Sequence, residues 1–306
     1  MDPKKIIFGP VLSRRLGYSL GIDLLPYKTC NLNCIYCESG KTTFYNEERK
    51  QFVDFKAVVK QIKSVKHDID YLTITGHGEP TLHLHLDKLI AMLKAEFNYP
   101  LVVITNSLLL RKAEVREEIR NIDVLMPSLD AVTQEVFEKI NVPHSPVRIK
   151  NVIRGLAEFR KIFKGKIWLE ILFCKGVNDT QAELQAMKEA VQKINPDKVQ
   201  LNTVVRPPAF KEQAVALANS ELQKIADFFN DKRVELIGGL QQKEKGLSLN
   251  KEELLRYLGR RPASFEEMVH LARGYCQNTR KILAELEKEN KIQKQVYDHQ
   301  VFFKTF

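Results

Sequence analysis

The sequence alternates short β-type runs with longer amphipathic runs, and this alternation constrains the fold more than any other feature. Six runs rich in Val, Ile and Leu show little polar alternation, as is typical of strands covered on both faces. They span residues 21–27, 70–75, 101–105, 123–128, 166–173 and 198–204. Apolar residues recur at helical spacing in residues 52–66, 86–96, 148–163, 180–194 and 220–232. Six strand-then-helix units predict an α/β protein with a parallel sheet and right-handed crossovers.

Polar and glycine-bearing segments follow the predicted strands directly, and they decide between an open sheet and a barrel. The segments are TGHGEPT, TNS, SLDA, CKGVNDT and RPPA, after the second to sixth strands in that order. In (β/α) barrels the active site is built at this C-terminal edge from successive loops. We therefore expect a partial (β/α)6 TIM-like barrel over residues 1–240.

The composition changes at residues 241–250, which read as a polar linker. Beyond it, residues 251–306 show three short helical patterns, followed by two strands around Asp298 and His299. This order predicts a small C-terminal winged helix-turn-helix domain. Ser264 and Glu267 are spaced as a capping box at the start of the second helix. Glutamates dilute the basic third helix, which favours docking of a substrate or partner over reading of DNA.

The composition indicates where the protein is located and which kinds of partner it can have. No apolar run approaches the roughly 18–20 residues that span a bilayer, and the N-terminus lacks a secretory h-region, so we expect a cytoplasmic protein without a membrane partner. Five cysteines, three of them clustered, argue against a disulfide framework and for metal or redox chemistry. The net charge of +10 permits a nucleic acid or another polyanion as partner, and fits a merely basic surface equally well.

Cys30, Cys34 and Cys37 form the cluster, with Tyr36 just before the last cysteine. Thiolates are soft ligands, so the group indicates zinc or iron–sulfur. Structural zinc usually takes four ligands, often as two separated pairs, and no second pair exists in this chain. Three protein ligands and one open position suit an iron–sulfur cluster better, because its fourth iron can meet a substrate or cofactor.

The C-x3-C-x2-C spacing resembles the signature of the radical S-adenosylmethionine (SAM) superfamily, and other motifs agree in order over residues 20–205. TGHGEPTLH is similar to its glycine–glutamate motif, with Gly78 and Glu79 where the SAM ammonium is received. SLDA is similar to its ribose-contacting position, with Ser128 and Asp130. GVND after the fifth strand recurs among its members. More narrowly, residues 8–37 and LNTVVRPPA resemble the branch related to wyosine-base synthases of tRNA.

The resemblance implies the cofactors and the reaction. Cys30, Cys34 and Cys37 would hold one [4Fe–4S] cluster, and SAM would bind its open iron. One electron would then cleave SAM to methionine and a 5′-deoxyadenosyl radical, which abstracts hydrogen from the substrate. Flavodoxin or ferredoxin is the expected electron donor. The substrate is left open between tRNA or other RNA and a protein or peptide. The alternative class is a metal- or redox-sensing winged-helix regulator.

Several site residues have a local alternative. Glu79 suits either the SAM ammonium or the cap of the following helix, and Asn106 suits either SAM or a turn. Ser128 and Asp130 fit the ribose better than a cap near Thr133. Asn178 is the SAM-side candidate of its loop, whereas its two successors, Asp179 and Thr180, read as N-caps.

Other reactive side chains are assigned less directly. Cys174 ends the fifth strand, where it is either a catalytic hydrogen-atom donor or, more simply, a packed core thiol. Three histidines, His77, His83 and His85, are expected at the surface. The basic residues of most interest are Arg14, Arg15 and Arg206. Arg206 follows the sixth strand, where it either meets the SAM carboxylate or a substrate anion or is simply a solvated arginine.

Overall fold

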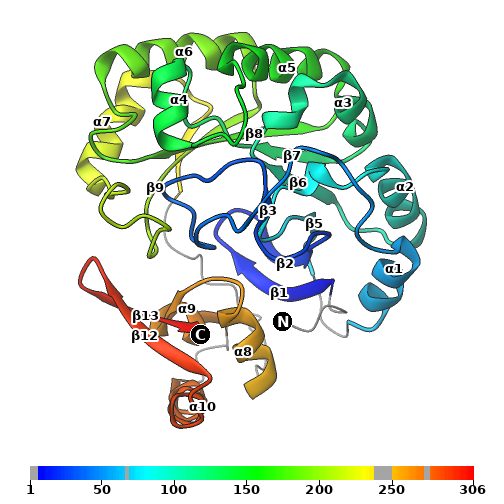
Figure 1. Cartoon of the computed structure of the whole chain (residues 1–306), viewed down its shortest axis with the longest axis vertical. Coiled ribbons are helices and arrows are strands. Elements are labelled where there is room, and N and C mark those ends of the chain that lie inside the picture. The colour runs from blue at the N-terminus through cyan, green and yellow to red at the C-terminus, as the bar shows by residue number, and fades with distance from the viewer. Residues whose placement is uncertain (1–5, 66–68, 238–249, 272–275) are drawn as a thin grey trace.

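A computed structural model describes residues 6–65, 69–237, 250–271 and 276–306, and its centre is an eight-stranded sheet (Figure 1). β1 pairs with β2 in the antiparallel sense, and every later neighbour in the order is parallel. The strands, in spatial order, are β1 (Ile7–Ser13), β2 (Gly17–Ile22), β5 (Tyr71–Ile74), β6 (Leu101–Thr105), β7 (Val124–Pro127), β8 (Lys166–Phe173), β9 (Lys198–Thr203) and β10 (Val234–Leu236).

Helices follow each of the parallel strands from β2 to β9 and form an outer arc around the sheet (Figure 1). Their buried faces carry apolar residues at helical spacing, such as Leu86, Leu89, Ile90 and Leu93 in α2, which pack into one core with the strands. The prediction of a partial (β/α)6 barrel is confirmed. The helices are α1 (Phe55–Lys63), α2 (Leu86–Glu96), α3 (Ala113–Ile119), α4 (Gln134–Ile140), α5 (Ile149–Ile162), α6 (Gln181–Ile194) and α7 (Asn219–Phe229).

Two details of the sheet differ from the prediction. The first parallel strand occupies Gly17–Ile22 rather than residues 21–27, because the chain leaves the sheet at Asp23, whose carboxylate accepts hydrogen bonds from neighbouring segments. The edge strands β1 and β10 were also missed. β1 contains Pro10, which weakens a strand pattern, and β10 has only three half-buried residues.

The C-terminal region contains the three predicted helices followed by the two predicted strands, and also a short strand between the first two helices that the sequence did not predict. Its helices are α8 (Lys251–Leu258), α9 (Phe265–Leu271) and α10 (Cys276–Lys288). A three-stranded sheet has the order β11 (Ala263–Ser264), β13 (Gln300–Thr305), β12 (Ile292–Tyr297). The winged-helix class and the domain limits stay predictions, and residues 241–249 of the predicted linker lie outside the described residues.

The C-terminal region packs against the β1–β2 hairpin of the barrel (Figure 1). Leu12 and Tyr18 from the hairpin join one apolar cluster with Leu254, Leu258 and Met268. In the parts of the chain that the structure describes, no helix is long and apolar enough to cross a membrane.

Candidate active site

A cavity of about 330 Å³ lies inside the barrel. Its wall includes side chains that point inward from the strands, among them Ser19, Thr73 and Asn202. Of the predicted site residues, Tyr36, Cys37, Ser128 and Asp130 line it. The C-terminal edge therefore brings together residues that are far apart in the sequence, as expected for a barrel.

The cysteine segment lies within the arc of strands, between β3 (Thr29–Cys30) and β4 (Phe44–Tyr45) (Figure 1). Each of its three sulfurs has one N–H donor from elsewhere in the chain. Asn106 Nδ2 lies 3.7 Å from the Sγ of Cys30, and Asn141 Nδ2 lies 3.4 Å from the Sγ of Cys34. Lys28 Nζ, on a 2% exposed residue, lies 3.2 Å from the Sγ of Cys37.

These donors show that the segment fits an iron–sulfur cluster. Hydrogen bonds to the sulfurs are a standard feature of cluster sites, where they stabilise thiolate ligands and tune the reduction potential. In the part of the chain that the structure describes, no three His, Cys, Asp or Glu side chains are grouped around a position for one metal ion. Burial raises the pKa of Cys30 to about 12 and also raises that of Cys34, so both thiols would need the positive charge of a bound metal to ionise near neutral pH.

Gly78 and Glu79 also lie next to the cysteine segment. A Cβ on Gly78 would lie 1.9 Å from the backbone oxygen of Thr29, so only glycine fits beside the first cysteine. The buried Glu79 carboxylate accepts hydrogen bonds from the Thr105 hydroxyl (2.6 Å), the backbone N of Asn106 (2.7 Å) and the backbone N of Thr81 (3.0 Å). Burial raises its pKa. Glu79 thus caps the short helix η1 (Pro80–Leu82), which is the alternative to SAM binding given in the sequence analysis. Its contact with SAM stays a prediction.

Asp130 holds the other side of the cysteine segment. Its carboxylate accepts hydrogen bonds from the Tyr36 hydroxyl (2.5 Å), Asn141 Nδ2 (2.9 Å) and the backbone N of Leu172 (2.9 Å). Burial raises the pKa of Asp130 to about 6. Asp130 makes no cap for α4, whose N-cap residue is Thr133, and the ribose role of Ser128 and Asp130 stays a prediction.

Asn178 and Cys174 lie beneath this wall. The amide of the fully buried Asn178 donates to the backbone oxygens of Asp130 and Leu172 and accepts from the backbone N of Cys174. These hydrogen bonds hold the backbone around Asp130 in place. Cys174 is fully buried in the apolar core, does not line the cavity, and has a pKa raised by burial. Thr180 caps α6 as predicted.

The expectation of surface histidines is wrong for two of the three. His85 is exposed, but His83 is fully buried, with Nε2 accepting from the backbone N of Phe52 at 3.1 Å. His77 is 5% exposed, and its Nδ1 lies 3.0 Å from the carboxylate of Asp23. The imidazole ring is polar, which favours a surface position, and these hydrogen-bond partners, which allow its burial, are distant in the sequence.

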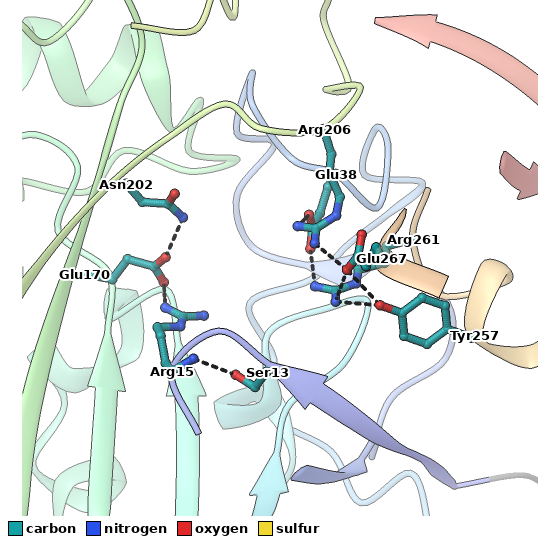
Figure 2. Close-up of polar contacts among 9 residues, drawn as sticks. All are labelled: Ser13, Arg15, Glu38, Glu170, Asn202, Arg206, Tyr257, Arg261 and Glu267. Atoms are coloured by element: carbon teal, nitrogen blue, oxygen red, sulfur yellow. Dashed lines mark hydrogen bonds and ion pairs between the residues drawn. The ribbon is translucent and has the colours of Figure 1, made fainter. Parts of the chain in front are cut away.

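Residues of the C-terminal region also enter the cavity wall: Tyr257, Arg260 and Arg261. Figure 2 shows Arg261, Tyr257 and Glu267 gathered around Arg206 and Glu38 of the barrel. The expected capping box is half formed: Ser264 Oγ accepts from the backbone N of Glu267, but the Glu267 carboxylate turns to the arginines. Lys28, Asn141, Arg260 and Glu267 were missed as site residues. Glu267 alone of these lies in a local motif, the capping box, and that motif does not point to the cavity.

Comparisons with known proteins agree with this geometry. The family profile of the radical SAM superfamily matches residues 24–188. The chain belongs to the radical SAM superfamily. UPF0026 protein MJ1312 of Methanocaldococcus jannaschii is 33% identical over 97% of this chain and 95% of its own length. The wyosine-synthase branch stays a prediction.

Two further comparisons cover only part of the other protein. GTPase Obg of Brachyspira hyodysenteriae is 37% identical over 84% of this chain, which spans 39% of that relative. SuiB of Streptococcus suis, solved with S-adenosylmethionine bound, shares the fold with a TM-score of 0.53 at 14% identity, over 69% of this chain and 48% of SuiB. Membership in the radical SAM superfamily makes the chain an enzyme with SAM and a [4Fe–4S] cluster as cofactors, which removes the regulator alternative.

Proposed function

We propose that the chain cleaves SAM reductively and directs the resulting radical at a substrate held in the barrel cavity. The observation that carries this proposal is the set of three cysteines, each with its own N–H donor, next to a cavity lined by Tyr36 and Asp130. The cofactors supply the chemistry: one electron breaks the sulfonium C–S bond of SAM, and the 5′-deoxyadenosyl radical takes a hydrogen atom from a substrate C–H bond.

The chain's own residues hold and shield the reaction. Lys28, Asn106 and Asn141 orient the thiolates, and the Glu79 carboxylate fixes the Asn106 segment. The barrel strands and residues of the C-terminal region line the cavity around this site. Flavodoxin or ferredoxin as the electron donor, a cytoplasmic location, and the docking of RNA or protein through the C-terminal region are parts of the proposal that rest on the sequence.

Anaerobic reconstitution with iron and sulfide tests the proposal. The expected result is about four irons per chain, and 5′-deoxyadenosine when dithionite and SAM are added. Cys34→Ala should lose both, whereas Cys174→Ala, with its thiol outside the cavity wall, should keep its iron. A colourless protein, or a reduced cluster that forms no 5′-deoxyadenosine, would refute the proposal.

A further inference from the structure

Five arginines line the barrel cavity, and they come from three separate segments of the chain. Arg14 and Arg15 lie in the β1–β2 turn, and Arg206 follows β9. Arg260 and Arg261 follow α8, so the C-terminal region contributes directly to this wall. The arginines concentrate positive charge in the wall of the cavity that the predicted SAM residues also line.

Four of these arginines have a carboxylate partner from the chain. Arg15 Nη1 lies 2.6 Å from Glu170. Arg206 lies 2.9 Å from Glu38 and 2.7 Å from Glu267, and Arg261 shares the latter at 2.8 Å (Figure 2). Arg260 pairs with the carboxylate of Asp23 and lies over the ring of Phe8, 4.4 Å from its centroid.

Arg14 differs from the other four. Within the described residues, its guanidinium makes no hydrogen bond or ion pair with the chain, although it lines the cavity. Burial and the nearby charge of Arg206 together lower the pKa of Arg14 to about 10, against the opposing effect of Glu38. Arg14 is half-buried in the cavity wall, so its charge is partly desolvated, and among the described residues it has no carboxylate in an ion pair with it. An anion that joined it would compensate this charge.

The local charge balance gives the size of this deficit. Arg14, Arg206 and Arg261 contribute three positive charges, and Glu38 and Glu267 contribute two negative ones, so three minus two leaves one positive charge in excess. A ligand with one anionic group at this position would balance it. Guanidinium groups bind phosphate and carboxylate in a bidentate way.

We propose that Arg14 is the centre of an oxyanion subsite that holds the phosphate or carboxylate group of a small substrate. This inference rests on the proposed function, since it assigns the ligand as the substrate of the same cavity. The cavity's volume of about 330 Å³ falls at the lower end of the range of small-molecule sites. Tyr36, Ser128 and Asp130 line the same cavity as Arg14, so an anion held at Arg14 would lie in the cavity that the predicted SAM residues also line.

Isothermal titration calorimetry of the reconstituted chain at constant ionic strength tests the subsite. The probes are inorganic phosphate, pyrophosphate and succinate. At least one should bind the wild type, and Arg14→Gln should weaken that binding at least about tenfold, as expected for a lost charge-assisted contact. Arg120→Gln is the matched control, because Arg120 is exposed and pairs with Glu117 on the surface. Arg14→Lys, which keeps the charge without the fork, should give an intermediate affinity even if Arg14→Gln does not fold.

The three probes distinguish a phosphorylated substrate from a carboxylate. Stronger binding of the phosphates assigns a phosphorylated substrate, and stronger binding of succinate assigns a carboxylate. The subsite is overturned if none of the probes binds, if both Arg14 variants bind them as the wild type does, or if Arg14→Gln loses SAM and keeps the anion. No turnover is needed, so a chain that binds the anion but cannot cleave SAM refutes only the proposed function.

Discussion

The hydroxyl of Tyr36 donates a 2.5 Å hydrogen bond to the carboxylate of Asp130, which links the cysteine segment to the end of β7. Asn141 bonds the same carboxylate and also the sulfur of Cys34. Two residues that the sequence places beside SAM therefore also hold the cysteine segment in the barrel. Support of this kind keeps reactive groups at fixed positions, as a site that controls a radical requires.

Replacing Tyr36 with Phe tests this link. The variant removes one donor and leaves a buried carboxylate with less compensation, so we expect the free energy of unfolding to fall by about 1–3 kcal/mol. Urea denaturation measures the change. Tyr45→Phe is the control, because Tyr45 is 39% exposed and stacks on His144 through its ring. Equal stability of the two variants would show that the Tyr36–Asp130 bond holds nothing in place.

Lys28 provides a prediction about the reduction potential. Its ammonium lies 3.2 Å from the Sγ of Cys37, and a positive donor on a ligand sulfur favours the reduced cluster. Lys28→Met should lower the potential by on the order of 50 mV, about one tenfold step for a one-electron couple. A redox titration followed by electron paramagnetic resonance measures it.

The control for Lys28 is Lys41, which lies between β3 and β4. Lys41 is exposed, and its ammonium sits over the ring of Phe210, 4.7 Å from the centroid. Lys41→Met removes the same charge from a place where no sulfur receives it, so its potential should match the wild type. A common shift in both variants would assign the effect to net charge and not to the Cys37 contact.

Gly78→Ala is expected to disturb the cysteine segment. The new Cβ would lie 1.9 Å from the backbone oxygen of Thr29, which cannot move without displacing Cys30. Overpacking of this kind costs about 1–3 kcal/mol, and we expect a lower iron content per chain after reconstitution. Gly259→Ala is the control, because its Cβ would meet its nearest neighbour at an ordinary 3.4 Å. Full iron content in Gly78→Ala would contradict the expectation.

Local pattern was enough to predict some of this structure and not the rest. The helix predicted at residues 86–96 is α2 to the residue, because its apolar spacing reports the face it buries. Cys30, Cys34 and Cys37 were recognised because their spacing is local. The Asn141–Cys34 contact joins residues 107 apart, and the Arg260–Asp23 pair joins residues 237 apart. Such partners depend on how the elements pack, which no local spacing encodes.

Glu267 illustrates this limit within one residue. Its spacing from Ser264 marked it as part of a capping box, and its backbone N–H does donate to the Ser264 hydroxyl oxygen. Its carboxylate instead lies among Arg206, Arg261 and Tyr257, which joins the C-terminal region to the barrel.

The ion pairs of Glu267 with Arg206 and Arg261 lead us to expect that stability depends on pH. Although burial raises the pKa of Glu267, the charges of Arg261 and Arg206 outweigh it and hold the pKa below its ordinary value of 4.5. A lowered carboxyl pKa adds stability above pH 4.5 that is lost as the pH falls below it. Glu267→Gln should therefore lower the free energy of unfolding at pH 7 by roughly 1.5–3 kcal/mol, and no more than that because Glu38 still pairs with both arginines. Between pH 5 and pH 3, roughly the range of this titration, the variant should lose less stability than the wild type. Urea denaturation at both limits measures this, with the exposed neighbour Glu266→Gln as control. If Glu267→Gln and Glu266→Gln lose the same free energy at pH 7, the ion pairs at Glu267 do not join the C-terminal region to the barrel.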